Sequence, residues 1–462
     1  MSTQARTNSP ELHAKTAPKN QSGSTPSIVP APVVLTDRPG HLAYYHWVRA
    51  GSEAFAALLE PEDMAIQSMP DASPTKWHLA HTSWFFETFL LRPHAPHYTP
   101  FDESFSVLFN SYYEQIGPQW ARAQRGQLSR PTINQVLSYR AHVNAAMEQL
   151  IATTSQTTWE TIRILIILGL NHEQQHQELM ATDLKHMLAQ NPLSPAPFEA
   201  PFKHTPQNVS PLSPLSWSEL EGGIVSQGRD LHPEEFAFDN EGPCHDVLLQ
   251  PYLLANRLVT NGDYLNFIQD KGYDRSELWL SDGWADVQSH KWAHPLYWRA
   301  QEDGSYTEYT LAGAQALDLT QPVTHLSAYE AAAYAQWAGA RLPREAELEH
   351  ATKNQTLTGN FYAPGAIAPH PHRAQRDEAP LQQLFGDCWE WTQSAYSAYP
   401  RYQAPSGAVG EYNGKFMCNQ MVLRGGSCAT PHGHMRATYR NFFPAGTRWQ
   451  FSGLRLALDT PV

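Results

Sequence analysis

The segment His172-Glu173-Gln174-Gln175-His176 places two histidines four residues apart, with a glutamate next to the first. On an α-helix, residues i and i+4 lie on the same face one turn apart, so both imidazoles can bind one metal ion. The same order, H-E-x-x-H, occurs in zinc metalloproteases, in which the glutamate is the general base. The spacing therefore predicts a metal site and leaves the chemistry at that site open.

The surrounding sequence has helical periodicity and directs both histidines inward. One stripe at 3.6-residue spacing contains Leu165, Leu168, His172, His176, Leu179, Asp183 and Met187. Two buried imidazoles at i and i+4 each need a partner for their ring nitrogens. A metal ion provides one, and the core of a helix bundle is a common place for such a site.

A third ligand is expected from an earlier helix, in the segment KWHLAHTSWFF. His81 lies on the apolar stripe of that segment, and His78 lies at its edge, so we predict His81 as the ligand with His78 as the alternative. Three imidazoles without a carboxylate leave open positions on a divalent metal, a variant of the arrangement in non-haem Fe(II) enzymes that activate oxygen. Spacing alone does not distinguish iron from zinc.

The sequence disfavours a zinc protease. A metzincin has a third histidine six residues after the second, and position 182 is Thr182. A gluzincin uses a glutamate from a following helix, whereas the nearby candidate, Glu199, lies in a proline-rich stretch.

The elements that must position these residues are expected to be four long helices forming a bundle. They cover 41–59, 73–91 (closed by Pro93), 132–151 and 157–188, the last capped by Thr157 or Thr158. The long aromatic connection between the second and third helices, 93–131, is typical of a functional loop. Short strand-like runs follow the bundle, with only two helices expected, at 260–270 and 327–340.

This organisation predicts a multidomain α and α+β protein. The expected parts are a disordered leader (1–37), a four-helix bundle (38–190), a proline-rich linker (191–215) and an α+β domain (216–462).

Composition excludes several partners. The net charge is −13, from 45 acidic and 32 basic residues, without a dense basic run, which argues against nucleic acid or an anionic membrane surface. Four cysteines without C-x-x-C spacing, the lack of an apolar signal core and the lack of a membrane-length apolar run favour a reducing cytoplasm.

Several motifs carry a resemblance to a known family. KWHLAHTSWFFETFLL, LFNSYYEQIG and NHEQQHQELMATDLKH resemble the DinB-like bundle of ergothioneine-biosynthetic sulfoxide synthases (EgtB-type). PVTHLSAYEAAAYAQWAGARLPREAELEHA, GDCWEWTQSAYSAYP and LRGGSCAT resemble a formylglycine-generating-enzyme (FGE-sulfatase) domain, which has a C-type-lectin-like fold. The two domains occur in the family's order over about residues 38–460.

The resemblance implies an oxidoreductase with Fe(II) as cofactor. Such an enzyme uses O2 to join the sulfur of cysteine or γ-glutamylcysteine to the imidazole C2 of hercynine (N-α-trimethylhistidine), and the product is a sulfoxide. Its metal ligands would be His81, His172 and His176, in agreement with the helical periodicity. Gln175 would contact the substrate imidazole.

Further site residues follow from the same resemblance. Tyr112 and Tyr113, in FNSYYEQ, match a tyrosine pair that supplies a proton or hydrogen bond in the cysteine-using branch. Asn441 would bind the carboxylate of hercynine, and Phe442 would face its trimethylammonium group, which π faces recognise.

Two features concern the thiol substrate. Arg122 and Arg125 could hold its carboxylate by paired N–H donors. Phe443 stands where synthases that use γ-glutamylcysteine carry an aspartate, so this departure favours cysteine.

The C-terminal domain departs from true formylglycine-generating enzymes because it lacks their closely spaced cysteine pair. Cys428 stands alone and Cys418 is ten residues earlier, so we expect a scaffold and substrate wall, with Trp389 and Trp391 in its core. Three alternatives stay open. The first is an ovothiol-type synthase acting on unmodified histidine, which usually carries an added methyltransferase domain that is not found after Val462. The others are a zinc hydrolase and a metal-containing binding protein without turnover.

Overall fold

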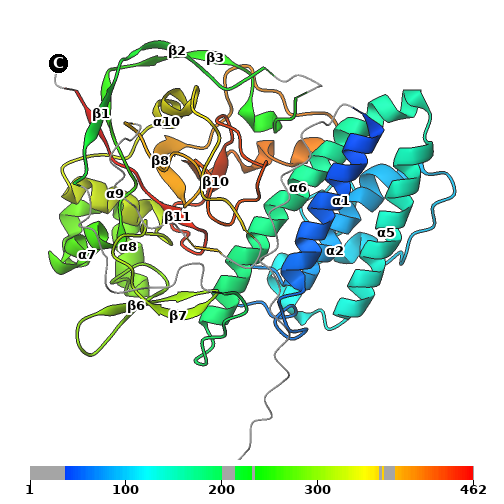
Figure 1. Ribbon diagram of the computed structural model, residues 1–462, viewed down its shortest axis with the longest axis horizontal. Coiled ribbons are helices and arrows are strands. Elements are labelled where there is room, and N and C mark those ends of the chain that lie inside the picture. The colour runs from blue at the N-terminus through cyan, green and yellow to red at the C-terminus, as the bar shows by residue number, and fades with distance from the viewer. Residues whose placement is uncertain (1–36, 200–213, 231–234, 364–366, 369–379, 461–462) are drawn as a thin grey trace, which may run out of the picture. The chain divides into compact units, whose positions relative to one another are not determined.

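The N-terminal part of the chain is a bundle of four long helices (Figure 1). They are α1 (Arg38–Ala56), α2 (Thr75–Phe86), α5 (Ile133–Thr153) and α6 (Gln156–Ala189). The computed structural model describes residues 37–199, 214–230, 235–363, 367–368 and 380–460. All four helices agree with the sequence-based expectation in place and order.

Side-chain caps fix where these helices begin. Thr132 and Gln135 form a capping box at the start of α5. Ser155 caps α6 by accepting the N–H of Thr158 at 3.2 Å, so the predicted caps, Thr157 and Thr158, are wrong. After α2 the helical chain continues through a π-helical turn (Glu87–Leu91) and α3 (Arg92–His94), one residue past the predicted end at Pro93.

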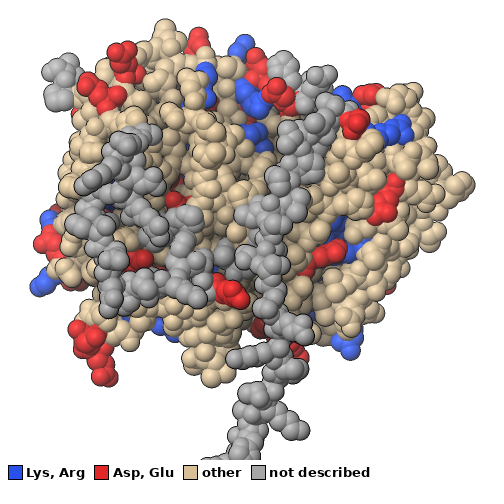
Figure 2. Space-filling model, viewed as in Figure 1, with Lys and Arg blue, Asp and Glu red and all other residues tan. Residues whose placement is uncertain are grey.

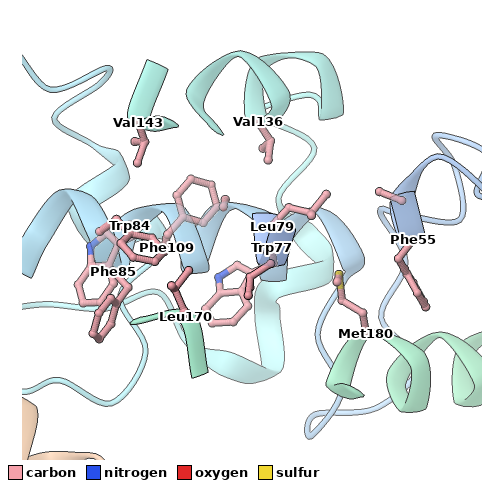
Figure 3. Packing of buried hydrophobic residues seen from close by; sticks show 14 of the residues in the cluster. Phe55, Trp77, Leu79, Trp84, Phe85, Phe109, Val136, Val143, Leu170 and Met180 are labelled. Atoms are coloured by element: carbon pink, nitrogen blue, oxygen red, sulfur yellow. The ribbon is translucent and has the colours of Figure 1, made fainter. Parts of the chain in front are cut away.

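The bundle core lies where α2 passes between α5 and α6 (Figure 3). Val136 and Val143 of α5 approach α2 from one side, and Leu170 and Met180 of α6 lie on the other. Every residue of α2 is buried, including its polar ones. A helix buried on all sides cannot show a one-sided apolar stripe, and its polar side chains must find partners inside the protein.

The C-terminal part contains short strands in four small sheets. Strand orders are β1-β4-β12, β10-β9-β8-β11, β2-β3 and β5-β6-β7, from β1 (Trp217–Leu220), β2 (Gly223–Gln227), β3 (His245–Leu249), β4 (Tyr252–Ala255), β5 (Trp298–Ala300), β6 (Tyr306–Thr310), β7 (Gly313–Ala316), β8 (Trp389–Ala395), β9 (Met421–Arg424), β10 (Asn441–Phe443), β11 (Ser452–Gly453) and β12 (Ala457–Asp459). Strand β10 is an edge strand that pairs with β9 in antiparallel register, Asn441 opposite Leu423. This pairing sets the position of three predicted substrate residues.

Among the described residues, four α-helices rather than the expected two accompany these strands. The expected ones are α7 (Asn261–Gln269) and α9 (Ala328–Trp337), and the additional ones are α8 (Ser281–His290) and α10 (Glu345–Thr352). Helix α10 buries three glutamates, Glu345, Glu347 and Glu349, against arginines. Its inner face is therefore charged, and hydrophobic periodicity could not indicate it.

The long connection after α3 contains one short helix, α4 (Phe105–Leu108), and a 3-10 helix, Arg122–Gln127. Of the predicted leader, only Asp37 is described, and of the predicted linker, only 191–199 and 214–215. None of the described helices has the length and apolarity to span a membrane. On the face in Figure 2, basic and acidic side chains of the described residues alternate without a large basic patch.

Candidate active site

Three histidines from two bundle helices converge on one point. His81 of α2 and His172 and His176 of α6 each place a ring nitrogen within 4.8 Å of the others, and all three side chains are buried. The Nε2 atoms of His81 and His172 are 3.3 Å apart. Two nitrogen ligands about 2.1 Å from one ion lie roughly 3 to 3.5 Å apart, so this separation fits a shared metal.

The protonation states also suit metal binding. Burial lowers the pKa of His172 to about 3, and it lowers the pKa of His81 and His176 well below the usual value of 6.5. Neutral imidazoles carry the lone pair that a metal requires. The Nδ1 of His81 is 2.6 Å from the carbonyl oxygen of Phe109 and must donate its proton there, which leaves Nε2 as the ligand atom.

His78, the alternative ligand, lies behind this cluster. Its Nδ1 is 2.8 Å from Nδ1 of His176, and its Nε2 is 3.1 Å from Oδ2 of Asp183. Both ring nitrogens of His78 are therefore occupied by protein groups. The three histidines whose ring nitrogens converge are His81, His172 and His176, and the choice of His81 over His78 as a metal ligand stays a prediction.

Glu173, the central glutamate of the H-E-x-x-H segment, points away from the histidines toward α1 and α5. Its carboxylate accepts hydrogen bonds from Arg49 (2.8 Å), Arg140 (2.9 Å) and the hydroxyl of Ser52 (2.7 Å). Burial alone would raise the pKa of Glu173, but the two arginines outweigh it and lower the pKa to about 2. A carboxylate so held cannot serve as a general base at the metal, which argues against the zinc hydrolase.

A cavity of about 370 Å³ opens beside His176. Its walls come from α2, α6, the long connection after α3 and the C-terminal domain. The residues that line it are Ser73, Trp77, His78, Ser111, Tyr112, Gln119, Arg122, Arg125, Gln175, His176, Glu178, Leu179, Thr182, Asp183, Trp389, Tyr412, Asn413, Phe416, Tyr439, Arg440, Asn441, Phe442, Phe443 and Gln450. All the predicted substrate-binding residues are among them.

The tyrosine pair divides between the cavity and the core. Tyr112 lines the cavity, whereas Tyr113 is buried behind it, packed against Trp84 and Phe89. Burial raises the pKa of both phenols above their usual value, so each keeps its proton near neutral pH. Of the two hydroxyls, only that of Tyr112 belongs to a cavity-lining residue.

The predicted arginine pair also divides. Arg122 is more than half exposed and lies 3.8 Å from a carboxylate oxygen of Asp71. Arg125 is buried, with its guanidinium 3.4 Å above the ring of Trp77, and it donates to the hydroxyls of Ser73 and Ser111. Within the described part of the chain no carboxylate forms an ion pair with Arg125, and burial, followed by the charge of Arg122, lowers its pKa to about 9. Asp183 supplies a nearby negative charge without a direct ion pair, so the guanidinium of Arg125 is still suited to bind an anion.

The C-terminal wall is formed by strand β10 and its aromatic neighbours. Asn441, Phe442 and Phe443 line the cavity in succession. Phe442 stacks on Tyr396 with ring centroids 4.0 Å apart and lies 6.1 Å from the ring of Phe416. Trp389 and Trp391 are buried as expected, although Trp389 also borders the cavity.

Three residues that the sequence did not indicate, Tyr439, Glu178 and Tyr412, take part in the contacts that join the two domains at this cavity. Gln175 donates to the hydroxyl of Tyr439 at 2.6 Å. Glu178 accepts hydrogen bonds from Trp389 (2.7 Å), Ser427 (2.5 Å) and Thr430 (2.7 Å). The ring of Tyr412 lies 5.5 Å from that of His172. Such contacts join positions more than 200 residues apart, and nothing in local spacing could have revealed them.

The C-terminal domain also holds the loop that carries the tyrosines. The carboxylate of Glu411 accepts the backbone N–H groups of Glu114 (2.8 Å) and Gln115 (3.1 Å). Lys415 donates to the carbonyl of Tyr112 and lies 5.4 Å from the centroid of its ring. We call Glu411 and Lys415 the loop clamp, because together they fix the backbone on both sides of Tyr113.

Fold and site together define a class: a helical bundle with a three-histidine centre, closed by a mixed α+β domain that completes its cavity. The chain belongs to the family of the sulfatase-modifying factor enzyme 1-like domain (FGE-sulfatase), which matches residues 208–379 and 371–460, more than half of the sequence. The DinB superfamily matches residues 44–180, within the helical part.

Relatives with both parts are found among bacteria. The chain is 29% identical to a hercynine oxygenase of Mycobacterium tuberculosis over 447 residues, which cover 90% of this chain and 98% of the relative. It is also 29% identical to the hercynine oxygenase of Mycolicibacterium smegmatis, over 87% of this chain and 95% of the relative.

A fungal protein matches over a shorter stretch. Ergothioneine biosynthesis protein 1 of Schizosaccharomyces pombe is 29% identical over 53% of this chain and 31% of the relative. These relatives confirm the predicted resemblance to ergothioneine-biosynthetic sulfoxide synthases, the predicted fold class and the expectation of an oxidoreductase enzyme.

Proposed function

We propose that this protein is a non-haem Fe(II) sulfoxide synthase that uses O2 to join the sulfur of cysteine to the imidazole C2 of hercynine. The observation that carries the proposal is the convergence of three neutral imidazoles beside a cavity that also contains an unpaired buried arginine. A ferrous ion held by His81, His172 and His176 would supply the electrons and open coordination positions that oxygen chemistry requires.

The reaction balances with one molecule of O2. Hercynine loses the hydrogen on C2 and cysteine loses the hydrogen on sulfur, so the C–S bond forms by a two-electron oxidation. Conversion of that sulfur to the sulfoxide removes two more electrons. Dioxygen accepts all four, one oxygen atom enters the product and the other leaves as water.

Residues on two sides of the cavity orient the substrates in this proposal. Gln175, whose amide nitrogen donates to Tyr439, directs its carbonyl oxygen toward the substrate imidazole N–H. Asn441 binds the carboxylate of hercynine. The π faces of Phe442 and Phe416 attract the trimethylammonium group, whose charge cannot be met by hydrogen bonds. Holding both reacting atoms in fixed positions lowers the entropic part of the barrier.

Arg125 binds the carboxylate of the thiol substrate. It lies on Trp77, and Trp77 stacks on His81 with 4.6 Å between centroids, so this anion site lies next to the histidine cluster. The exposed guanidinium of Arg122 attracts the same substrate carboxylate at longer range. Tyr112 holds the proton that it donates to oxygen during the reaction, and burial keeps that proton on the phenol at neutral pH.

Cysteine is favoured over γ-glutamylcysteine as the sulfur donor. The second amino-acid unit of γ-glutamylcysteine carries an ammonium group, for which Phe443 offers no ionic partner. Fe(II) as the metal, cysteine as the donor and a cytoplasmic location stay predictions from the sequence.

The test is a single-vessel reaction with mass analysis. The protein is reconstituted with Fe(II) under anaerobic conditions, mixed with hercynine and cysteine, and exposed to air-saturated buffer. The expected product has the mass of hercynine plus cysteine plus one oxygen, less two hydrogens. Parallel reactions replace cysteine by γ-glutamylcysteine and hercynine by histidine, and His172→Ala protein is the negative control. The absence of a coupled product with either thiol would refute the proposal, and coupling to histidine alone would favour the ovothiol-type synthase.

A further inference from the structure

Beside the histidine cluster, two buried side chains that the reaction proposed above does not use, Asp183 and His78, form a hydrogen-bonded chain that ends at the proposed ligand His176. Asp183, His78 and His176 are linked in this order by contacts of 3.1 Å and 2.8 Å. Asp183 and His78 are each only 3% exposed. The same carboxylate oxygen of Asp183 also accepts the backbone N–H of Ser73 at 2.7 Å. The chain thus connects the start of α2 with the metal-facing side of α6.

The chemistry of these groups fixes the direction of each hydrogen bond. An ionised carboxylate only accepts, so Nε2 of His78 must carry the proton that faces Asp183. Neutral His78 then presents a lone pair at Nδ1, which accepts the proton on Nδ1 of His176. That leaves the Nε2 of His176 unprotonated, and this atom is free to point toward His81 and His172. The order of donors makes His176 an Nε2 ligand.

The other two ligands differ in their support. His81 is fixed in the same sense by the carbonyl of Phe109. The Nδ1 atom of His172, in contrast, has no hydrogen-bond partner among the described residues. One ligand is therefore held by a backbone carbonyl, one by a carboxylate acting through a histidine, and one by packing alone.

We propose that His78 and Asp183 are positioning residues for the metal centre, which hold His176 in the tautomer and orientation that bind the ion and so raise the affinity of the site. Outer groups of this kind typically change metal affinity by about 10- to 100-fold when they are removed. The inference rests on the proposed function only in assuming that His81, His172 and His176 bind a divalent metal. It does not depend on the substrates.

The experiment measures metal affinity directly, without substrates or oxygen. Fe(II) is titrated anaerobically into full-length apoprotein in competition with a chromophoric chelator, and the titration is repeated with Co(II). His78→Phe removes both hydrogen bonds and should weaken binding by about 10- to 100-fold. His78→Gln offers a carbonyl to His176 and an N–H to Asp183, so it should recover most of the affinity.

The matched control is His186→Gln. His186 lies ten residues after His176 on α6 and contacts the hydroxyl of Ser68 at 2.6 Å; the charge of Asp183 acts on it, but among the described residues no hydrogen bond joins it to Asp183, His78 or His176. Its replacement should leave metal affinity unchanged, and the thermal midpoint of each apoprotein shows whether the fold is intact. Should His78→Phe fail to fold, Asp183→Asn preserves the shape of the site, and a loss of about 10-fold, the lower end of the same range, is expected from it.

Two results would overturn the proposal. One is a folded His78→Phe protein, or a folded Asp183→Asn protein in its place, that binds metal as tightly as the natural protein. The other is a His186→Gln protein weakened to the same degree, which would assign the effect to general loosening of α6. Because the natural protein's own metal affinity and turnover are measured separately, a failure of the proposed reaction leaves this test intact.

Discussion

The two sides of the cavity differ in how their polar groups are satisfied. On the bundle side, His81, His78 and Asp183 all have partners inside the protein, and Glu173 has two arginines and a serine. On the substrate side, Arg125 is buried without a carboxylate ion pair within the described chain. Apart from Nδ1 of His172, which has no partner among the described residues, these bundle-side groups are held by the protein and keep their geometry whether or not a ligand is present. A region with an unused buried charge is completed by the ligand itself.

This contrast predicts which substitutions affect the fold, which affect metal and which affect substrate. The largest effect is expected from His172→Ala, which removes a ligand whose neighbours cannot replace it. We expect loss of stoichiometric metal binding and of turnover, measured by metal analysis of the purified protein and by product mass. His46→Ala is the control, because His46 is half exposed on α1. Its Nε2 lies 3.7 Å from a carboxylate oxygen of Glu148, which is also exposed. Retention of metal by His172→Ala would show that the centre lies elsewhere.

Glu173→Gln should act on stability rather than on chemistry. Removing one partner of a buried ion-pair network costs about 3 to 5 kcal/mol, seen as a lower free energy of unfolding in urea. The folded fraction should retain its turnover to within about tenfold, since the side chain faces away from the metal. A Glu173→Gln protein that keeps its natural stability but has lost all turnover would instead indicate that this glutamate acts as a general base at the metal, as in a zinc hydrolase.

The same glutamate gives a pH dependence with a defined sign. Its pKa in the folded state is about 2, below the usual 4.5, so its contribution is complete above about pH 4.5 and is lost as the pH falls toward 2. Those two values correspond to about 3 kcal/mol, an order-of-magnitude figure. Unfolding free energies measured from pH 6 to pH 2 should therefore fall less steeply for Glu173→Gln than for the natural protein.

Replacement of Tyr112 and of Tyr113 by phenylalanine should lower turnover by unequal amounts. Tyr112→Phe removes the hydroxyl of the tyrosine that lines the cavity, and turnover at saturating substrate should fall about 100-fold, the usual contribution of a proton donor. Tyr113→Phe, at a buried position behind it, should lower turnover less than about tenfold. Hercynine binding, measured by calorimetry under anaerobic conditions, should change little in either protein. The reverse order of effects would assign the proton to Tyr113.

Arg125→Met should raise the KM for cysteine with a smaller change in kcat. A hydrogen-bonded charge pair contributes about 1.5 to 3 kcal/mol, which corresponds to roughly a 10- to 100-fold increase. Arg122→Met is the matched control at the exposed position, with an expected change below about threefold. Equal effects of the two substitutions on the KM for cysteine would mean that the positive charge of both arginines attracts the cysteine carboxylate, without direct binding by Arg125.

The smallest effect is expected at the loop clamp. Glu411→Gln keeps the size of the side chain but weakens its hold on the N–H groups of Glu114 and Gln115. The difference between charged and neutral acceptors is about 1 kcal/mol, so kcat should fall about three- to tenfold while metal affinity stays constant. A change in metal affinity would show that the clamp supports the bundle side as well.

The predicted site residues came from two kinds of signal, helical spacing on the bundle side and family resemblance on the substrate side, and their roles stay predictions. His172 and His176 could be chosen because the periodicity of α6 relates spacing to direction, whereas α2 is buried on all sides and its sequence separates His81 from His78 only weakly. Asp183 lay on the predicted stripe of α6. Its proposed role depends on His78, which the predicted stripe of α2 placed only at its edge. Contacts such as Glu178 with Trp389 or Gln175 with Tyr439 join distant segments and leave no local pattern.

The missed helices have a physical explanation of the same kind. Helix α10 buries Glu345, Glu347 and Glu349 against arginines, among them Arg424 of strand β9, so a polar segment takes the place of an apolar face. Helix α8 buries only Gly283 and Val287, which is too little apolar surface for a recognisable stripe. Helix α6 begins after Ser155 and not at Thr157 or Thr158. All three are good capping residues, and the local sequence does not decide among them.

The edge position of strand β10 has a consequence for how such a protein can change over time. All three of its residues border the cavity, but only one side of the strand pairs with another, β9. Substitutions there alter what the cavity accepts without breaking a ladder on the free edge and without touching the histidines. We therefore expect that substitutions at the three residues of β10 can change substrate preference during evolution while the bundle and its histidines stay the same.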